Sequence, residues 1–446
     1  MSVLFHQRLG LLSRRIPYLQ RHAGASSTRR LSEMSLAPRF PGAVDSPMTT
    51  QMSFTSPSQV ACIPTFHVMG RHGGLADETR EPPQVADSQV LTWYKNMLTV
   101  NIMDAIMFEA QRHGRVSFYM VSAGEEGVTI GSAAALDPAD VITCQYREHG
   151  VFLQRGFALK DFMSQLTANH NDPGRGRNMP NHYSGKAKVN VHAVASTLGT
   201  QIPHATGAAY ALKMLDMEAP NEQPRVAAAY FGEGAASEGD FHAAVNIAAV
   251  RKCPVLFLCR NNGFAISTPT DEQYAGDGIA IRGLGYGVES IRVDGTDIFA
   301  VYEATKEARR KALEGGGRPI IVEFMSYRVS HHSTSDDSSA YRDHKDVEAW
   351  KTQNSPITRL RKYLEGRGLW NEEQENECRK AIRADVLREL VAAEKEKKPS
   401  LSSIFDDVYH ELTEEAKEQR EELRRLLEKY PEEYDVHQHE GGLQGL

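Results

Sequence analysis

The sequence predicts an α/β fold, in which a parallel sheet flanked by helices is followed by a helical C-terminal region. Between about residues 115 and 330, short apolar runs alternate with segments rich in small residues at helical spacing. Strands that alternate with helices form parallel sheets, because each helix returns the chain to the same end of the sheet. Beyond about residue 352 the composition shifts to Glu, Lys, Arg and Leu at helical spacing, so surface helices should follow the sheet.

The individual elements follow from the spacing of apolar residues. In the first helix apolar residues recur every three or four positions, which favours an amphipathic helix. Buried strands are expected at Val141–Cys144, Val226–Phe231, Val255–Cys259 and Ile320–Met325. Helices are expected at roughly Asp87–His113, Ile202–Leu215 and Phe241–Val250, with another starting at Pro356.

Composition limits the classes of protein to which the chain can belong. With 446 residues, 41% of them apolar, it can bury a sizeable core. No run of about 18 apolar residues occurs, so neither a membrane span nor a membrane partner is expected. A net charge of −7 argues against a nucleic-acid partner. Five cysteines without a CxxC pair indicate ordinary thiols in a reducing compartment.

The N-terminus differs from the rest of the chain. Residues 1–32 contain six arginines, and no acidic residue precedes Glu33. This composition is typical of a mitochondrial transit peptide, and a disordered basic tail is the alternative. We therefore expect four parts, which are a transit peptide (1–45), an extended arm (46–86), an α/β domain (87–351) and a helical region with a polar tail (352–446).

The segment from Val226 to Asn262 carries the most chemical information. The apolar run VAAAYF leads into Gly232-Glu233-Gly234, and PVLFLC leads into Arg260-Asn261-Asn262-Gly263. Between them a helix is expected, capped by Ser237 with Asp240 three residues later. In such a βαβ unit the carboxyl ends of both strands lie at one edge of the sheet, where α/β proteins bind ligands. Glu233 and Asn262 should therefore lie close together.

These residue types fit a divalent cation. A carboxylate, an amide oxygen and a nearby backbone carbonyl form a hard oxygen site, which Mg²⁺ bound to a diphosphate would complete. Gly232 and Gly234 would let the backbone approach such a ligand. Alone, GxG after a strand is a weak indication of nucleotide binding, and Asn-Asn-Gly also suits a turn. No Walker lysine pattern is present, which argues against a simple nucleotide-binding module.

The same segment resembles the thiamine-diphosphate motif, which begins GDG and ends NN, with Glu233 in place of the usual aspartate. From about residue 85 to 430 the chain resembles the alpha subunits of the decarboxylating component of branched-chain 2-oxo acid dehydrogenases. The resemblance implies a thiamine-diphosphate-binding fold. The segments that carry it are QYREHG (145–150), FGEGAASEGD (231–240), CRNNGFAISTPT (259–270), IRVDGTD (291–297) and HHSTSDDSSAYR (331–342).

The resemblance also implies roles for individual residues. Mg²⁺ would be held by the side chains of Glu233 and Asn262 and the carbonyl of Phe264, and K⁺ by a turn containing Thr200 and Gln201. The expected catalytic residues are Gln145, Ser196 and His332. The expected cofactor-binding residues are Tyr146, Arg147, Ser196, Leu198, Gly232, Glu233, Gly234, Arg260 and His332.

Each of these roles has a plainer alternative. Arg147 could form a surface ion pair with Glu148. His332 could be a solvated histidine in a mobile polar loop. Thr200 could cap a helix N-terminus.

The family resemblance further implies an assembly. The carboxylate that engages the aminopyrimidine ring would come from a beta subunit, so this chain alone should be inactive and should work in a heterotetramer of two alpha and two beta subunits. Other expected partners are a lipoyl-bearing transacylase core in the mitochondrial matrix, and a kinase and a phosphatase that act on Ser333. The alternatives are the alpha subunit of a pyruvate dehydrogenase, or a non-catalytic regulatory subunit with the same fold.

Overall fold

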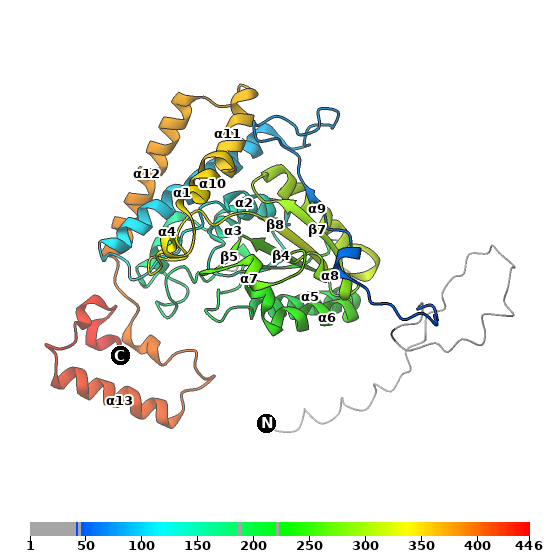
Figure 1. Ribbon diagram of the computed structural model, residues 1–446. Coiled ribbons are helices and arrows are strands. Elements are labelled where there is room, and N and C mark those ends of the chain that lie inside the picture. The colour runs from blue at the N-terminus through cyan, green and yellow to red at the C-terminus, as the bar shows by residue number, and fades with distance from the viewer. Residues whose placement is uncertain (1–41, 43–45, 186–188, 220–222) are drawn as a thin grey trace. The chain divides into compact units, whose positions relative to one another are not determined.

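A mixed α/β architecture organises the chain around one parallel sheet (Figure 1). The computed structural model describes residues 42, 46–185, 189–219 and 223–446. The predicted transit peptide, residues 1–45, lies outside the described residues apart from Gly42. One compact unit covers Ala61–Leu446, and a separate unit ends at Val60.

The main sheet contains six strands among the described residues, and every neighbouring pair runs parallel. Their spatial order is β1-β7-β8-β4-β3-β2. The predicted fold class, a parallel sheet flanked by helices, is therefore confirmed. The strands are β1 (Thr65–Phe66), β2 (Val141–Thr143), β3 (Ala227–Gly232), β4 (Val255–Asn261), β7 (Glu289–Asp294) and β8 (Ile320–Met325).

Helices cover both faces of this sheet. In Figure 1, α1 and α2 lie above the sheet and α5 and α6 lie below it. Along β4, Leu256 and Leu258 belong to one apolar cluster, whereas Phe257 and Cys259 belong to the other. Because both faces are buried, the strand residues form a continuous apolar run. The helices that contribute are α1 (Asp87–Arg112), α2 (Glu126–Ala135), α5 (Gln201–Glu218), α6 (Gly239–Arg251) and α9 (Ile298–Leu313).

Two strands of the sheet were not predicted. Strand β7 places Arg292 inside the sheet, where its Nε donates to Glu323 at 3.1 Å. This charged residue interrupts the apolar pattern by which strands are recognised. Strand β1, within the predicted arm, has two residues and is too short to show any periodicity.

The capping prediction for the βαβ helix was wrong. Ser237 ends a short 3-10 helix, η3 (Ala235–Ser237), and α6 begins only at Gly239. Glu238 occupies the N-cap position and makes no capping hydrogen bond through its side chain. The sharp turn after Gly234 uses the residues that would otherwise have formed the first turn of the helix.

The C-terminal helices are present as expected. Helix α11 begins at Pro356, and Ser355 caps it by accepting a hydrogen bond from the amide of Thr358 at 3.3 Å. Leu360 in α11 and Leu390 in α12 belong to the same core cluster as Trp93 in α1. The boundary predicted at residues 351 and 352 falls within α10. These helices are α10 (His344–Gln353), α11 (Pro356–Gly366), α12 (Glu372–Lys395) and α13 (Glu414–Lys429).

Short elements complete the described part of the chain. They are α3 (His149–Gln154), α4 (Leu159–Leu166), α7 (Thr270–Gln273), α8 (Arg282–Gly285), and a small antiparallel hairpin of β5 (Phe264–Ala265) and β6 (Thr268–Pro269). No helix in the described part of the chain combines the length and apolar character that a membrane span requires.

Candidate active site

Two polar side chains meet where β3 and β4 end. The strands are neighbours, with Gly232 opposite Arg260, so the residues that follow them emerge at the same edge. The amide of Asn262 donates a hydrogen bond to Oε2 of Glu233 at 3.3 Å. The predicted meeting of these two residues is therefore confirmed.

A cavity of about 430 Å³ opens at this edge, and Glu233 and Asn262 both line it. It also contains most of the residues expected to contact a cofactor. Ser196 is the exception, because it is exposed and lies outside the lining. The lining comprises Gln145, Tyr146, Arg147, Leu198, Gly232, Glu233, Gly234, Ala235, Glu238, Arg260, Asn262, Phe264, Ala265, Ile266, Thr268, Gln273, Arg328 and His332.

Glu233 is a buried carboxylate with one free oxygen. The residue is 2% exposed, and among the described residues Oε1 has no hydrogen-bond partner. Burial raises the pKa of Glu233 to about 7, because the charged form loses its hydration. An unpartnered carboxylate oxygen inside a cavity is costly unless a cation or a donor reaches it.

The amide of Asn262 is oriented by its neighbours. Its Nδ2 donates to Oε1 of Glu125 at 2.9 Å, and its Oδ1 accepts from the amide of Phe264 at 3.3 Å. The amide oxygen is thus on the same side as the backbone of Phe264. Among the described residues, no three His, Cys, Asp or Glu side chains gather to hold a metal. A cation here would therefore depend on one carboxylate with amide, carbonyl and ligand oxygens, which is a donor set that suits Mg²⁺.

Arg260 is the centre of a buried ion triad. Its Nε donates to Glu148 at 2.5 Å, and its Nη1 pairs with Glu125. Burial alone would lower the pKa of Arg260, but the negative charges of Glu148 and Glu125 outweigh it and raise the pKa. Glu148 therefore pairs with Arg260. The alternative suggested by the sequence, a surface ion pair between Arg147 and Glu148, was wrong.

Two arginines, Arg147 and Arg328, give the cavity a cationic wall. Arg147 donates through Nη1 to the carbonyl of Val121 at 2.5 Å and through Nη2 to that of His332 at 2.9 Å. Arg328, only 1% exposed, has a buried Nε for which the described part of the chain provides no hydrogen-bond acceptor. Both guanidinium groups thus meet carbonyl or hydroxyl oxygens and keep their positive charge available for an anion.

The imidazole of His332 lies beside these guanidinium groups. Burial and then the charges of Arg147 and Arg328 lower the pKa of His332 to about 3. The ring is therefore neutral at physiological pH and would contact an anion as a hydrogen-bond donor. Its Nε2 lies 3.2 Å from the hydroxyl of Tyr146, so His332 is neither solvated nor isolated.

Glycine is required at only one of the two predicted positions. A Cβ on Gly234 would lie 2.6 Å from the Cβ of Ala265, so a side chain there would displace the hairpin. A Cβ on Gly232 would meet no atom nearer than 3.9 Å. The amide of Gly232 instead donates to Oε1 of Gln145 at 3.1 Å, which fixes this side chain at the cavity wall.

The comparison with known proteins identifies the family. Residues 94–402 match the model of the dehydrogenase E1 component family. The chain belongs to that family. Members depend on thiamine diphosphate, and an alpha subunit of such an enzyme works with a beta subunit.

Curated relatives align over nearly the full chain. The "2-oxoisovalerate dehydrogenase subunit alpha, mitochondrial" of Mus musculus is 48% identical over 93% of this chain and 92% of its own length. The protein of the same name from Caenorhabditis elegans is 46% identical over 97% and 98%. The alpha 2 subunit of Arabidopsis thaliana is 45% identical over 89% and 82%. The predicted resemblance is thereby confirmed.

The expected potassium turn of this dehydrogenase component adopts a defined geometry. The hydroxyl of Thr200 donates to the carbonyl of Thr197 at 2.9 Å. Gln201 donates through Nε2 to the carbonyl of Tyr230 at 3.1 Å and begins α5. Thr200 occupies the N-cap position without a capping hydrogen bond from its side chain, so the helix-cap alternative was wrong.

The serine loop of the E1 component is fixed by hydrogen bonds. Ser333 is buried, and its Oγ accepts from the amide of Ser335 at 3.2 Å. Asp336 accepts from the amide of His332 at 2.7 Å and from the hydroxyl of Tyr341 at 2.6 Å. The loop therefore holds His332 against the cofactor cavity.

Two residues of the candidate site and its surroundings, Arg328 and Glu125, were not identified from the sequence. Arg328 follows the end of β8, at the same sheet edge as Glu233, and that position could have identified it. Glu125 precedes α2 and contacts both Asn262 and Arg260. No local pattern marks Glu125, because its partners are distant in the sequence.

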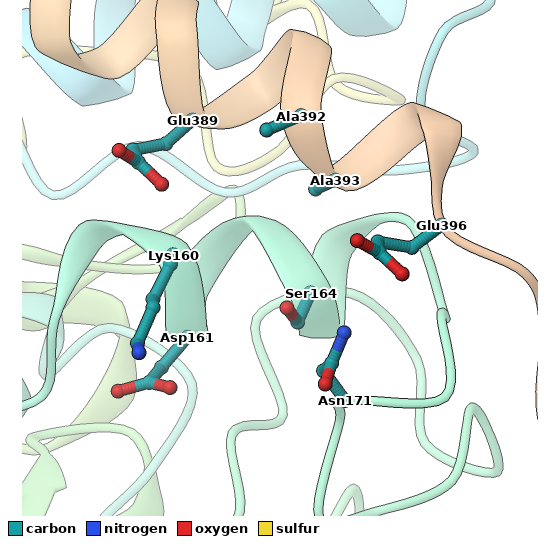
Figure 2. A pocket seen from close by; sticks show the side chains of 8 residues that line it. All are labelled: Lys160, Asp161, Ser164, Asn171, Glu389, Ala392, Ala393 and Glu396. Atoms are coloured by element: carbon teal, nitrogen blue, oxygen red, sulfur yellow. The ribbon is translucent and has the colours of Figure 1, made fainter.

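A second cavity lies away from the sheet edge. Figure 2 shows it between α4 and the C-terminal end of α12, with a volume of about 320 Å³. Its charged lining residues are Lys160, Asp161, Glu389 and Glu396, three of them acidic. A mostly acidic lining does not suit a diphosphate, so the first cavity is the better candidate for binding one.

The burial of Glu126 should make the free energy of unfolding depend on pH. Glu126 is buried at the start of α2, where it accepts from Asn101 and from the amide of Gly124, both at 2.9 Å. Burial raises its pKa to about 7. The unfolded chain ionises first, so the free energy of unfolding should fall by up to about 3 kcal/mol as the pH rises from 4.5 through 7.

Urea denaturation between pH 5 and pH 8 would measure this effect. Buried Glu233 titrates over the same range, so Glu126→Gln should remove about half of the total pH dependence, and the exposed control Glu432→Gln should behave as the wild type. An unchanged pH dependence in Glu126→Gln would contradict the assignment.

Proposed function

We propose that this chain is the alpha subunit of a mitochondrial 2-oxo acid dehydrogenase that decarboxylates branched-chain 2-oxo acids. Its acyl product would pass to a lipoyl group on a transacylase core. The unpartnered Oε1 of Glu233 carries the proposal, because this carboxylate, whose Oε2 accepts from the backbone amide of Asn262, lines a cavity that Arg147, Arg328 and His332 also line. The names of its relatives support the substrate class and a location in the mitochondrial matrix.

The cavity suits a metal-bound diphosphate. Glu233 and Asn262 would hold Mg²⁺ through their side chains and Phe264 through its carbonyl. Arg147, Tyr146 and His332 would contact the phosphate oxygens. The free carboxylate oxygen of Glu233 is complementary to the metal ion, and the guanidinium group of Arg147 is complementary to the diphosphate.

Arg260 would act beside the diphosphate. It borders the cavity, and its ion pairs with Glu148 and Glu125 fix the orientation of its guanidinium group. Its positive charge also offsets two carboxylates that would otherwise repel the ligand.

Other residues would orient the reacting groups. Thiamine diphosphate, when bound, would supply the nucleophile and the electron sink for decarboxylation. Leu198 and Ser196 would contact its aminopyrimidine ring, and Gln145, fixed by Gly232, would face the substrate. A carboxylate of the beta subunit would engage the ring, so the active form would contain two alpha and two beta subunits.

A potassium ion could stabilise the turn before α5. The backbone oxygens around Thr200 and the side chain of Gln201 would provide its ligands. Such an ion would fix the position of Leu198, two residues earlier, at the cofactor cavity.

Ser333 would be the point of regulation by a kinase and a phosphatase. Phosphorylation adds a charge of about −1.5 to −2 at neutral pH. Ser333 is buried beside His332, where a phosphate would compete with the diphosphate for the same cations. The modified loop would leave its present position, since the cavity cannot hold both anions.

The branched-chain assignment predicts a specific substrate profile. The assembled alpha and beta subunits should release CO₂ from 3-methyl-2-oxobutanoate, with kcat/KM roughly tenfold or more above that for pyruvate, because a fitted apolar pocket gains about 1–3 kcal/mol per extra methylene. Glu233→Gln should lower turnover by roughly 100-fold or more. The exposed control Glu289→Gln should not.

Two results would redirect this proposal. A preference for pyruvate would assign the chain to a pyruvate dehydrogenase. Absence of thiamine-dependent turnover with any 2-oxo acid, in an intact assembly, would favour a non-catalytic subunit.

A negative charge at Ser333 should inhibit the assembly. Ser333→Glu places a carboxylate beside His332 and should lower kcat/KM about tenfold, which corresponds to roughly 1.4 kcal/mol. Ser339→Glu is the matched control, because Ser339 lies in the same loop but is exposed. Full activity of Ser333→Glu in the decarboxylation assay would refute the mechanism of inhibition.

A further inference from the structure

A buried carboxylate in α1 connects to the cationic wall of the cofactor cavity. Asp104 is 1% exposed and accepts four hydrogen bonds. Its Oδ2 accepts from the amide and the hydroxyl of Ser122, both at 2.7 Å. Its Oδ1 accepts from the hydroxyl of Tyr119 at 2.7 Å and lies 3.0 Å from Nδ1 of His149. A carboxylate with this many hydrogen-bond partners fixes each of them in place.

The ring of His149 is held at both nitrogens. It is fully buried at the start of α3, and Nδ1 donates to Asp104. With the proton on Nδ1, its Nε2 accepts from the side-chain Nδ2 of Asn181 at 2.9 Å, and the carbonyl oxygen of Tyr146 packs against the ring at 3.1 Å. An apolar residue could fill the same space more cheaply, because a buried histidine must have polar partners. The histidine therefore determines orientation as well as packing.

The partners of this pair lead directly to the cavity. Ser122 follows Val121, whose carbonyl accepts from Nη1 of Arg147 at 2.5 Å. Arg147 is two residues before His149 in the turn that precedes α3. The buried His149 fixes the backbone at the end of this turn, and the carbonyl of Val121 fixes the guanidinium group of Arg147. A shift of either would move the guanidinium group relative to the diphosphate site.

Asp104 is also connected to the serine loop through Tyr119, from whose hydroxyl it accepts a hydrogen bond. Tyr119 donates through its amide to Oγ1 of Thr334 at 3.1 Å and accepts from the amide of Thr334 at 2.9 Å. Thr334 lies two residues after His332. Asp104 thus links α1 to the surroundings of Arg147 and of His332, although neither Asp104 nor His149 lines the cavity.

We propose that His149, held by Asp104, is a positioning residue that sets the Tyr146–Arg147 turn for binding the diphosphate. This role rests on the proposed function, since it presupposes that Arg147 contacts that ligand. It predicts that His149 acts on cofactor affinity through Arg147.

A double-mutant cycle tests the coupling. Calorimetric titration of the assembled alpha and beta subunits with thiamine diphosphate and Mg²⁺ gives the Kd of each variant. His149→Ala should raise the Kd between about 10- and 100-fold. In an Arg147→Ala background the same change should add less than about threefold, because the residue through which it acts is gone.

A purely structural role gives a different result. Loss of general packing would weaken binding by the same factor with or without Arg147, and this additivity would overturn the proposal. So would an unchanged Kd in His149→Ala. Wild-type assembly that binds no thiamine diphosphate would instead remove the proposed function, which keeps the two failures distinct.

Conservative variants provide the second arm of the test. His149→Asn places an amide donor near the position of Nδ1 and should recover part of the lost affinity, whereas the apolar His149→Leu should recover none. If His149→Ala fails to assemble, Asp104→Asn, which keeps the volume but cannot accept all four hydrogen bonds, should raise the Kd in the same way. Equal affinities for His149→Asn and His149→Leu would overturn the role of the hydrogen bond to Asp104.

Discussion

The site depends on one electrostatic constraint, which is the burial of the Glu233 carboxylate with an oxygen that no group in the described chain satisfies. Parallel pairing of β3 and β4 brings the carboxylate next to Asn262, whose backbone amide donates to Oε2, and burial makes the carboxylate's charge expensive. The same cavity has the complementary feature, because Arg147 and Arg328 make no carboxylate pair within the described part of the chain. A metal cation would pair with the Glu233 carboxylate, and an anion bound to that metal would pair with the guanidinium groups of Arg147 and Arg328. This complementarity favours a metal diphosphate over either ion alone.

The charged residues around the cavity are of two kinds, those held in buried ion pairs and those left available to a ligand. Arg260 is neutralised by Glu125 and Glu148, and this triad orients Asn262 through Glu125. Such buried pairs contribute little net stability, because desolvation offsets most of their attraction. Their value lies in fixing geometry, and the Asp104–His149 pair follows the same logic on the other side of the cavity.

The sequence predicted what depends on topology and periodicity. Strands β3 and β4 were recognisable because both faces of each are buried, and their shared direction predicted that Glu233 would meet Asn262. Strand β7 was not recognisable, because Arg292 is stabilised by an ion pair with a residue on a neighbouring strand. The partners of Arg260 could not be predicted for the same reason. Adjacency in the sequence suggested that Glu148 would pair with Arg147, whereas the fold directs it to Arg260.

The position of a bound metal tests the central claim most directly. Mn²⁺ can replace Mg²⁺ in an oxygen site and is visible by anomalous scattering in crystals of the alpha–beta assembly with thiamine diphosphate. The account predicts one anomalous peak at about 2.0–2.3 Å from the carboxylate of Glu233 and the amide oxygen of Asn262. A peak elsewhere in the cavity, with the Glu233 oxygen still unpartnered, would contradict it.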